Sequence, residues 1–315
     1  NNQMKSSLSE MLGVEHSIIM APMFLVTNVE MMIGALDNGI TAAIPALNFR
    51  TDDDMRSALN EIKAHTSKPF GVNLIVNKSN IKLKKQLQTC LDLEVAFIIT
   101  SLGNPEEIIN KCKPKGIKVF CDVVDLNYAK KVEASGADAV IAVNSEAGGH
   151  SGNLAQSELI PKLNSELNIP VISAGGISCK GDIDKAFELG AQGVSVGTIF
   201  IASDEAGVSE DYKNALVDYS ANDIIMTSHI SGTPLTVINT PYVKSLKSNN
   251  GWIKRKLLNN KKLKKITKLI IMSKGMNSLK KAATKPTYKT VWVAGPSIEN
   301  ITKINSVTDI IKSLT

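Results

Sequence analysis

The sequence predicts an α/β fold: a (β/α)8 barrel, the TIM-barrel architecture, with a small helical substrate-binding domain inserted before a C-terminal helix. Eight short apolar runs recur roughly every 20 to 30 residues along the first two thirds of the chain. Helix signals fill the gaps between them, and such alternation is typical of a parallel sheet. Eight units within about 200 residues fit a closed barrel better than a doubly wound sheet, and no Gly-x-Gly-x-x-Gly follows the first run.

Each predicted strand is too short for a helix and is rich in β-branched residues. This composition is expected of strands that are buried on both faces. The eight predicted strands cover residues 17–21, 41–45, 70–76, 95–99, 117–121, 139–143, 170–174 and 193–197.

The predicted helices begin and end at recognisable residues. The helix at 52–65 opens with three aspartates, which are favourable near a helix N-terminus. The helix that starts at Pro105 has a proline and two glutamates in its first turn. Glycine or Asn-Gly stops terminate the remaining helices, which we expect at 30–38, 126–135 and 182–189.

The pattern changes after Asn222, and we expect three parts: a barrel at 1–222, a small helical substrate or lid domain at 223–288, and a segment at 289–315 that packs back on the barrel. Residues 254–268 hold eight lysines and arginines, interleaved with leucine and isoleucine at helical spacing. A solvated helix face is the commoner origin of such a run. An acidic partner or a membrane surface is the alternative.

The composition is that of an ordinary soluble protein, with 43% hydrophobic and 21% charged residues. Only 4% of residues are aromatic, which argues against nucleic-acid binding by stacking. No apolar run approaches the roughly 18 residues needed to span a membrane. The four cysteines lack the spacing of a zinc site. We therefore expect a cytoplasmic protein with no metal, nucleic acid or membrane partner.

A glycine-rich loop with one histidine follows the sixth predicted strand. Gly148 and Gly149 precede His150, and glycine lets the backbone approach a ligand closely. Histidine titrates near neutral pH. A lone histidine is more often structural, but the glycines and the strand exit favour a catalytic role for His150. Glu146 lies in the same loop and would orient the histidine.

Two further glycine loops follow the seventh and eighth strands, where barrels of this kind often bind phosphate. Gly175 and Gly176 follow the seventh strand, and Gly197 and Thr198 follow the eighth. Backbone N–H groups and the Thr198 hydroxyl can surround a phosphate there. Either loop alone could be only a tight turn, but the pair predicts a phosphate site.

Asn73 and the residues after the first strand are predicted to face a planar heterocycle. Asn73 interrupts an apolar strand, and a buried amide must be hydrogen-bonded. The functional alternative to a local backbone bond is an amide that points up the barrel. Ala21, Pro22 and Met23 would form an apolar ledge for the same ring.

Asp122 and Asp125 flank the end of the fifth predicted strand. Either could belong to a site or cap the following helix. We prefer capping for Asp125 and leave both roles open for Asp122.

Taken together, these motifs resemble the nitronate monooxygenase family, formerly called 2-nitropropane dioxygenases. Each motif is modest alone, but their order over about 180 residues is specific. The matching segments are residues 21–23, 71–73, 146–152, 172–177 and 190–198.

The resemblance implies an FMN-dependent barrel in which His150 is the general base and the substrate is a nitronate oxidised with dioxygen. The cofactor-binding residues that it implies or that the motifs suggest are Ala21, Pro22, Met23, Asn73, Gly148, Gly149, Gly175, Gly176, Ser195, Val196, Gly197 and Thr198.

Several positions depart from the family pattern. Val143 and Ser195 stand where members often carry glutamine, so two cofactor contacts are altered or reduced to backbone. Ile199 replaces a frequent arginine, and the arginines usual after the Ser231-Gly232 turn are absent. The substrate side is therefore less defined than the cofactor side.

The flavin-type enoyl-acyl-carrier-protein reductases share the same motifs and form the main alternative. They reduce an enone-type double bond with NAD(P)H through FMN, and their acidic carrier would suit the lysine-rich segment. The Ala21-Pro22-Met23 motif after the first strand and the C-terminal segment that contains Trp292 favour the nitronate enzymes. A third alternative, a phosphate-ligand barrel without catalysis, conflicts with the His150 loop. A homodimer and the use of NAD(P)H stay open.

Overall fold

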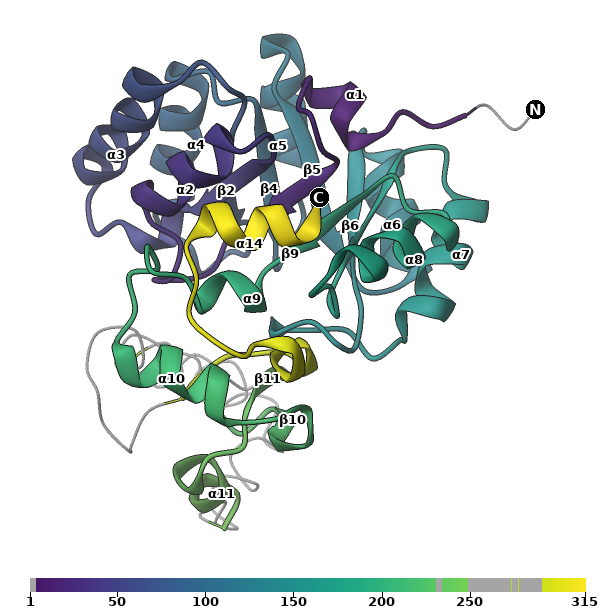
Figure 1. The fold of residues 1–315 in the computed structure, drawn as a ribbon. Coiled ribbons are helices and arrows are strands. Elements are labelled where there is room, and N and C mark those ends of the chain that lie inside the picture. Colours follow the sequence, from purple (N-terminus) through teal and green to yellow (C-terminus); the bar gives the residue numbers. More distant parts are fainter. Residues whose placement is uncertain (1–3, 231–233, 249–272, 274–276, 278–290) are drawn as a thin grey trace, which may run out of the picture.

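The computed structural model describes residues 4–230, 234–248, 273, 277 and 291–315. Eight parallel strands close into a barrel in the order β1-β2-β3-β4-β5-β6-β8-β9. Helices surround this barrel, and a smaller body lies beside one of its ends (Figure 1). The predicted (β/α)8 barrel is confirmed.

Every predicted strand corresponds to a barrel strand. β4 and β5 extend past the predicted ends because their last residues include Ser101 and Asp122, and polar residues end an apolar run in the sequence. The barrel strands are β1 (Ile18–Met20), β2 (Thr41–Pro45), β3 (Gly71–Ile75), β4 (Phe97–Ser101), β5 (Lys118–Val123), β6 (Ala139–Val143), β8 (Val171–Ala174) and β9 (Gly193–Val196).

Three of the helices between the strands, α2, α3 and α6, begin at a residue whose side chain accepts a hydrogen bond from the first turn. Thr51 and Asp125 each accept a hydrogen bond from the third backbone N–H of the helix that follows. The preference for capping by Asp125 is therefore confirmed. The helices are α2 (Val29–Asp37), α3 (Asp52–His65), α4 (Leu83–Asp92), α5 (Glu106–Cys112), α6 (Leu126–Ala134), α7 (Gln156–Glu166), α8 (Lys180–Glu188) and α9 (Thr198–Ile201).

The interior of the barrel is filled by large apolar side chains at its N-terminal end. The rings of Phe97 and Phe120 stack there with centroids 5.0 Å apart. The short helix α1 (Leu8–Leu12) closes this end with Leu8, which belongs to the same cluster. A Cβ on Gly71 would overlap the Phe97 ring, so β3 must begin with glycine. A second, larger cluster fills the space between the strands and the helices.

The smaller body contains a three-stranded antiparallel sheet in the order β10-β11-β7. Its strands are β10 (Ile224–Thr227), β11 (Leu235–Ile238) and β7 (Gly149–His150), and α10 (Glu210–Asp218) and α11 (Pro241–Ser248) lie in the same body (Figure 1). The expectation of a helical domain is wrong for 224–227 and 235–238, which are strands. These strands are short, and the sequence does not show that they pair with the distant His150 loop. The lysine-rich segment 254–268 lies outside the described residues.

The C-terminal segment runs from this body back to the barrel. Val293 bridges to Val237 of β11. The Tyr212 hydroxyl of α10 donates to the Val293 carbonyl over 2.7 Å, and its ring stacks on Trp292. The turn η4 (Pro296–Asn300) and the helix α14 (Val307–Leu314) follow, and α14 packs on α2, where Val307 lies against Gly34.

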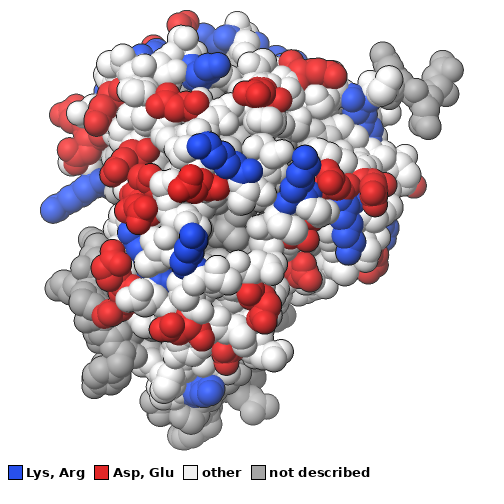
Figure 2. Space-filling view, viewed as in Figure 1, with Lys and Arg blue, Asp and Glu red and all other residues white. Residues whose placement is uncertain are grey.

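Acidic and basic side chains are interspersed over the face shown in Figure 2, and neither sign forms a continuous patch there. Among the helices that the structure describes, none has the length and apolar character that a membrane span requires.

Replacing Gly71 with alanine should destabilise the barrel by about 1–3 kcal/mol, because the added methyl group overpacks the Phe97 ring. Chemical denaturation measures this change in the free energy of unfolding. Gly181→Ala in α8 is the matched control, since its nearest neighbour would be the Cys179 sulfur at 3.8 Å. The control should be neutral or stabilising by up to about 1 kcal/mol. Equal stability of Gly71→Ala and wild type would contradict this packing.

Candidate active site

The inward-facing side chains become small or polar at the C-terminal end of the barrel. Successive strand residues alternate between faces, so residues two positions beyond the packed interior also point inward. The register places them at the ends of neighbouring strands. These residues would form the floor under a planar ligand bound at this end of the barrel. The layer, called the mouth layer below, consists of Asn73, Ser101, Asp122, Val143, Ala174 and Ser195.

Three members of the mouth layer form a directed chain of hydrogen bonds. The Asn73 amide nitrogen donates to the Ile99 carbonyl over 3.0 Å and to the Ser101 hydroxyl over 2.9 Å. Ser101 in turn donates to Asp122 over 2.6 Å. Asn73 has then used both of its donors, while its Oδ1 makes no hydrogen bond within the described part of the chain. This amide can therefore only accept a hydrogen bond from a ligand.

Asp122 is the clearest site residue that the sequence left undecided. Burial raises the pKa of its carboxyl to about 6, although the hydrogen bond from Ser101 acts in the opposite direction. Its position two residues beyond the interior Phe120 was the available signal in the sequence. Because a carboxyl with such a pKa gains or loses a proton near neutral pH, it is a candidate for proton handling in the mouth layer.

The two predicted phosphate-loop glycines after β8 both adopt left-handed conformations. Their φ angles are +114° at Gly175 and +74° at Gly176. A Cβ on Gly175 would collide with the Asn144 side chain, and one on Gly176 would collide with the Glu146 carboxylate. Glycine is thus required by both backbone conformation and space. The Glu146 carboxylate lies against this loop.

Asn144 is a site residue that the sequence analysis missed. It is fully buried, its amide nitrogen donates to the Gly175 carbonyl over 3.1 Å, and its Oδ1 accepts from the Glu146 N–H over 2.9 Å. Its backbone N–H donates to the Ala174 carbonyl. Asn144 therefore fixes the His150 loop to the loop after β8. An asparagine directly after an apolar strand was the only hint.

The C-terminal segment completes the site next to β9. The Gly295 N–H donates to the Thr198 hydroxyl over 3.0 Å. A Cβ on Gly148 would lie 3.0 Å from the Gly295 nitrogen and 3.1 Å from the Thr198 hydroxyl. The loop after β6, the start of α9 and the C-terminal segment, which are far apart in the sequence, therefore contact one another here. The sequence analysis did not assign Gly295, since its partners lie about 100 residues or more away.

The loop after β1 reaches the end of β9. The Ala21 N–H donates to the Val196 carbonyl over 2.8 Å, and Met23 is held by a bond from its N–H to Thr27. A Cβ on Gly197 would lie 3.6 Å from the Ala21 Cβ and from the Met23 sulfur. Pro22 lies between these two residues. The Val196 side chain belongs to the outer core, so only its backbone can face a ligand.

His150 lies at the junction of the barrel and the smaller body. It pairs with Leu235 of β11, and the next residue, Ser151, bonds to the Thr236 hydroxyl at 2.7 Å. His150 is exposed, yet the surrounding protein removes enough water to lower the pKa of its imidazole. The imidazole is therefore mainly neutral at pH 7 and able to accept a proton.

The chain forms a closed barrel with polar and glycine-lined loops at its C-terminal end. This is the arrangement of a barrel enzyme. The family model described as nitronate monooxygenase matches residues 79–315. The chain belongs to the nitronate monooxygenase family and is a flavin-type oxidoreductase.

Similar proteins carry different names. A (3aS,4S,5R,7aS)-5-hydroxy-7a-methyl-1-oxo-octahydro-1H-indene-4-carboxyl-CoA dehydrogenase of Rhodococcus jostii is 31% identical over 243 residues, 77% of this chain and 68% of that protein. A probable nitronate monooxygenase of Staphylococcus saprophyticus is 27% identical over 289 residues, covering 78% of this chain and 81% of the relative. The two proteins therefore share the family with this chain but differ in their named activities.

Two solved structures share the whole fold. FabK from Thermotoga maritima superposes with a TM-score of 0.84 at 30% identity, covering 99% of this chain and 95% of FabK. A nitroalkane oxidase from Streptomyces ansochromogenes has a TM-score of 0.82 at 21% identity, with coverage of 96% and 95%. The second likeness shows the fold alone.

Asp122→Asn should remove a pH-dependent loss of stability. Because the folded pKa is raised from 3.8 to about 6, the folded state holds the proton more tightly than the unfolded state does. Wild type should therefore lose on the order of 2–3 kcal/mol relative to Asp122→Asn as the pH rises from about 4 to above 6. Denaturant unfolding of both proteins across this range measures the difference.

Asp125→Asn is the matched control, because asparagine caps a helix about as well as aspartate. It should keep the pH dependence of wild type. A constant difference between Asp122→Asn and wild type at every pH would rule out a raised pKa at Asp122.

Proposed function

We propose that the protein is an FMN-dependent nitronate monooxygenase that oxidises alkyl nitronates or nitroalkanes with dioxygen, with His150 as general base. The observation that carries the proposal is a largely neutral histidine in the glycine loop that follows β6, whose last residue, Val143, belongs to the mouth layer. The match to the nitronate monooxygenase family over residues 79–315 supports the substrate class.

The residues at the barrel mouth fit FMN. Val143 and Ala174 are smaller than Ile141 and Ile172, the inward residues two positions before them, and this difference would make space for a flat ring. A Cβ would fill the cradle at Gly148, at Gly175 or at Gly176. Bound FMN would supply the electron-accepting chemistry that side chains lack.

The phosphate end would be held by Gly176, Gly197 and Thr198. Because the Thr198 oxygen already accepts from Gly295, its hydroxyl hydrogen is directed to another acceptor, which a phosphate oxygen supplies. The ring end would lie between Asn73 and the Met23 ledge. Asn73 would accept a hydrogen bond there, since both of its donors are engaged in the mouth layer.

His150 would take the proton from the carbon that bears the nitrogen. A neutral imidazole nitrogen accepts this proton, and the lowered pKa keeps the imidazole neutral at working pH. The backbone pairing of His150 with Leu235 fixes its position relative to β11. The smaller body thus positions the base, while the barrel positions the ring.

A second candidate is chemistry next to a thioester carbonyl, as in the flavin-type enoyl-acyl-carrier-protein reductases. The relative that is 31% identical is named as a dehydrogenase of a carboxyl-CoA compound, which is also a thioester. This candidate keeps the same cofactor and the same histidine. It differs in the electron donor, which would be NAD(P)H for enoyl reduction.

His150→Asn should retain bound flavin but lower kcat/KM for a neutral nitroalkane by about 10²–10⁴-fold, the usual contribution of a general base. For wild type, kcat/KM should rise with pH, because the base works deprotonated. The pKa that describes this rise should lie below the ordinary histidine pKa. Steady-state kinetics and flavin absorbance check both statements.

His65→Asn is the matched control, because His65 is exposed on α3 and pairs with Asp37. It should keep wild-type turnover. Wild-type turnover in His150→Asn would remove the histidine from the mechanism.

Anaerobic reduction of the flavin should separate the two candidates. A nitronate should bleach the flavin absorbance quickly, and NADH or NADPH should do so slowly or not at all. Stopped-flow spectroscopy with each donor measures the rates. Rapid bleaching by NADPH together with inertness toward nitronates would favour enoyl reduction instead.

A further inference from the structure

A second cavity lies apart from the mouth layer, between the loop after β2 and the start of α4. Its volume is about 260 Å³. The loops after β2 and β3 both leave the barrel at its C-terminal end, so the cavity lies at the rim of the catalytic face. None of the residues assigned above to FMN or to His150 chemistry lines it.

The floor of this rim cavity is apolar. Ala46 and Met55 are each 1% exposed, and the half-buried Phe49 ring lies beside them. A flat, apolar group such as a nucleobase packs favourably on such a floor.

The side chain of Gln86 lines the rim cavity and has an amide donor without a protein partner. Gln86 is only 6% exposed, and its Oε1 accepts from the Asn80 side chain over 3.0 Å. The same Asn80 nitrogen donates to the Ile75 carbonyl at the end of β3, which fixes the amide orientation. The Gln86 Nε2 makes no hydrogen bond within the described residues. The Nε2 atom keeps contact with solvent, so it can donate to an acceptor on a ligand in the cavity.

Three cationic side chains surround the opening of the rim cavity: Arg50, Lys82 and Lys85. The Lys82 ammonium donates to the Arg50 carbonyl over 2.7 Å and so joins the two sides. The positive charges of these arginine and lysine side chains are available to bind an anion.

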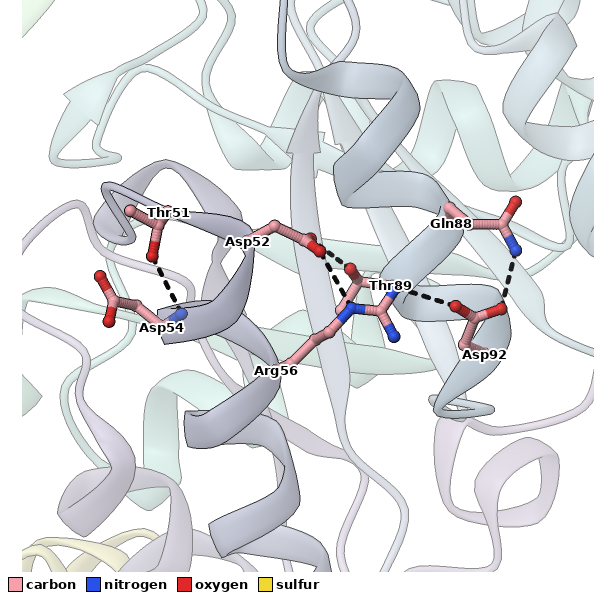
Figure 3. A network of polar contacts seen from close by, with 7 residues as sticks. All are labelled: Thr51, Asp52, Asp54, Arg56, Gln88, Thr89 and Asp92. Carbon is pink, nitrogen blue, oxygen red and sulfur yellow. Dashed lines mark hydrogen bonds and ion pairs between the residues drawn. The ribbon is translucent and has the colours of Figure 1, made fainter.

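Asp52 is the acidic residue among the described residues that line the rim cavity, and other groups engage both of its oxygens. Arg56 donates to one oxygen over 2.9 Å, and the Thr89 hydroxyl donates to the other (Figure 3). Arg56 also pairs with Asp92 at 2.8 Å, which holds this network on the α3 and α4 side. The remaining charge at the opening is therefore positive.

We propose that the rim cavity binds a nucleoside phosphate, with the base on Phe49 and Met55 and the phosphate at Arg50 and Lys85. The volume is below the roughly 300 Å³ of a typical small-molecule pocket, so it fits one end of a longer ligand. An adjoining hollow of about 420 Å³ has room for the next portion, and its charged lining residues are Lys85 and Arg56 together with Asp52 and Asp53. The site goes beyond the proposed function, since it requires neither His150 nor nitronate chemistry.

Adenosine diphosphate is the probe, because pyridine dinucleotides and coenzyme A share this portion. Isothermal titration calorimetry of the flavin-loaded, full-length protein at low ionic strength measures its Kd. ADP should bind more tightly than either adenosine or pyrophosphate, because each of these fills only part of the site. Pyrophosphate that binds as tightly as ADP would overturn the base position on Phe49.

Two variants locate the binding. Lys85→Met removes a cation, and Gln86→Glu keeps the acceptor for Asn80 while it replaces the donor with a negative oxygen. Each should raise the Kd for ADP on the order of tenfold. Lys84→Met is the matched control on the same helix, because Lys84 does not line the cavity, and it should change the Kd less than about twofold. Unchanged melting temperature and flavin content show that a variant is folded.

No ADP binding to wild type, or binding that Lys85→Met and Gln86→Glu leave unchanged, would overturn the proposal. Competition with ADP by NADPH would assign the site to a pyridine dinucleotide, and competition by coenzyme A would assign it to an acyl thioester. Both results support a nucleoside phosphate site. Because flavin reduction by nitronates does not depend on Lys85, failure of this proposal is distinguishable from failure of the proposed function.

Discussion

The site depends on how the barrel interior is filled. Phe97 and Phe120 occupy the N-terminal half so completely that β3 must begin with Gly71. Two residues further along each strand, the inward side chains become small or polar. Large side chains are closely packed in the N-terminal half of the barrel, and smaller or polar side chains follow at its C-terminal end. Both features follow from the same strand register. A ring at the mouth would rest on a rigid apolar surface.

The histidine loop is held by contacts from three directions. Asn144 ties it to the loop after β8, Gly295 brings the C-terminal segment against Gly148, and β11 pairs with His150 itself. His150 therefore follows a barrel strand and pairs with a strand of the smaller body, so both parts of the molecule fix its backbone.

The two candidate chemistries share one geometry. Under either proposal, Asn73 would accept a hydrogen bond, and Asp122 and the neutral His150 would hold or move a proton, while the cofactor would supply the redox chemistry. Sequence departures at Val143 and Ser195 fall in the mouth layer, where they leave small side chains. If FMN binds there, neither position offers a side-chain amide to its ring.

The sequence by itself determined the barrel, because eight buried strands and their helix caps are local patterns of hydrophobicity and capping. It also indicated His150, Asn73 and the glycine loops, whose residue types carry their own chemistry. Tertiary structure alone decided the partners. The Asn73–Ser101–Asp122 chain, the role of Asn144, the contact of Gly295 with Thr198 and the pairing of β7 with β11 join segments that are far apart in the sequence. Such contacts arise from barrel register and chain return, which no local pattern records.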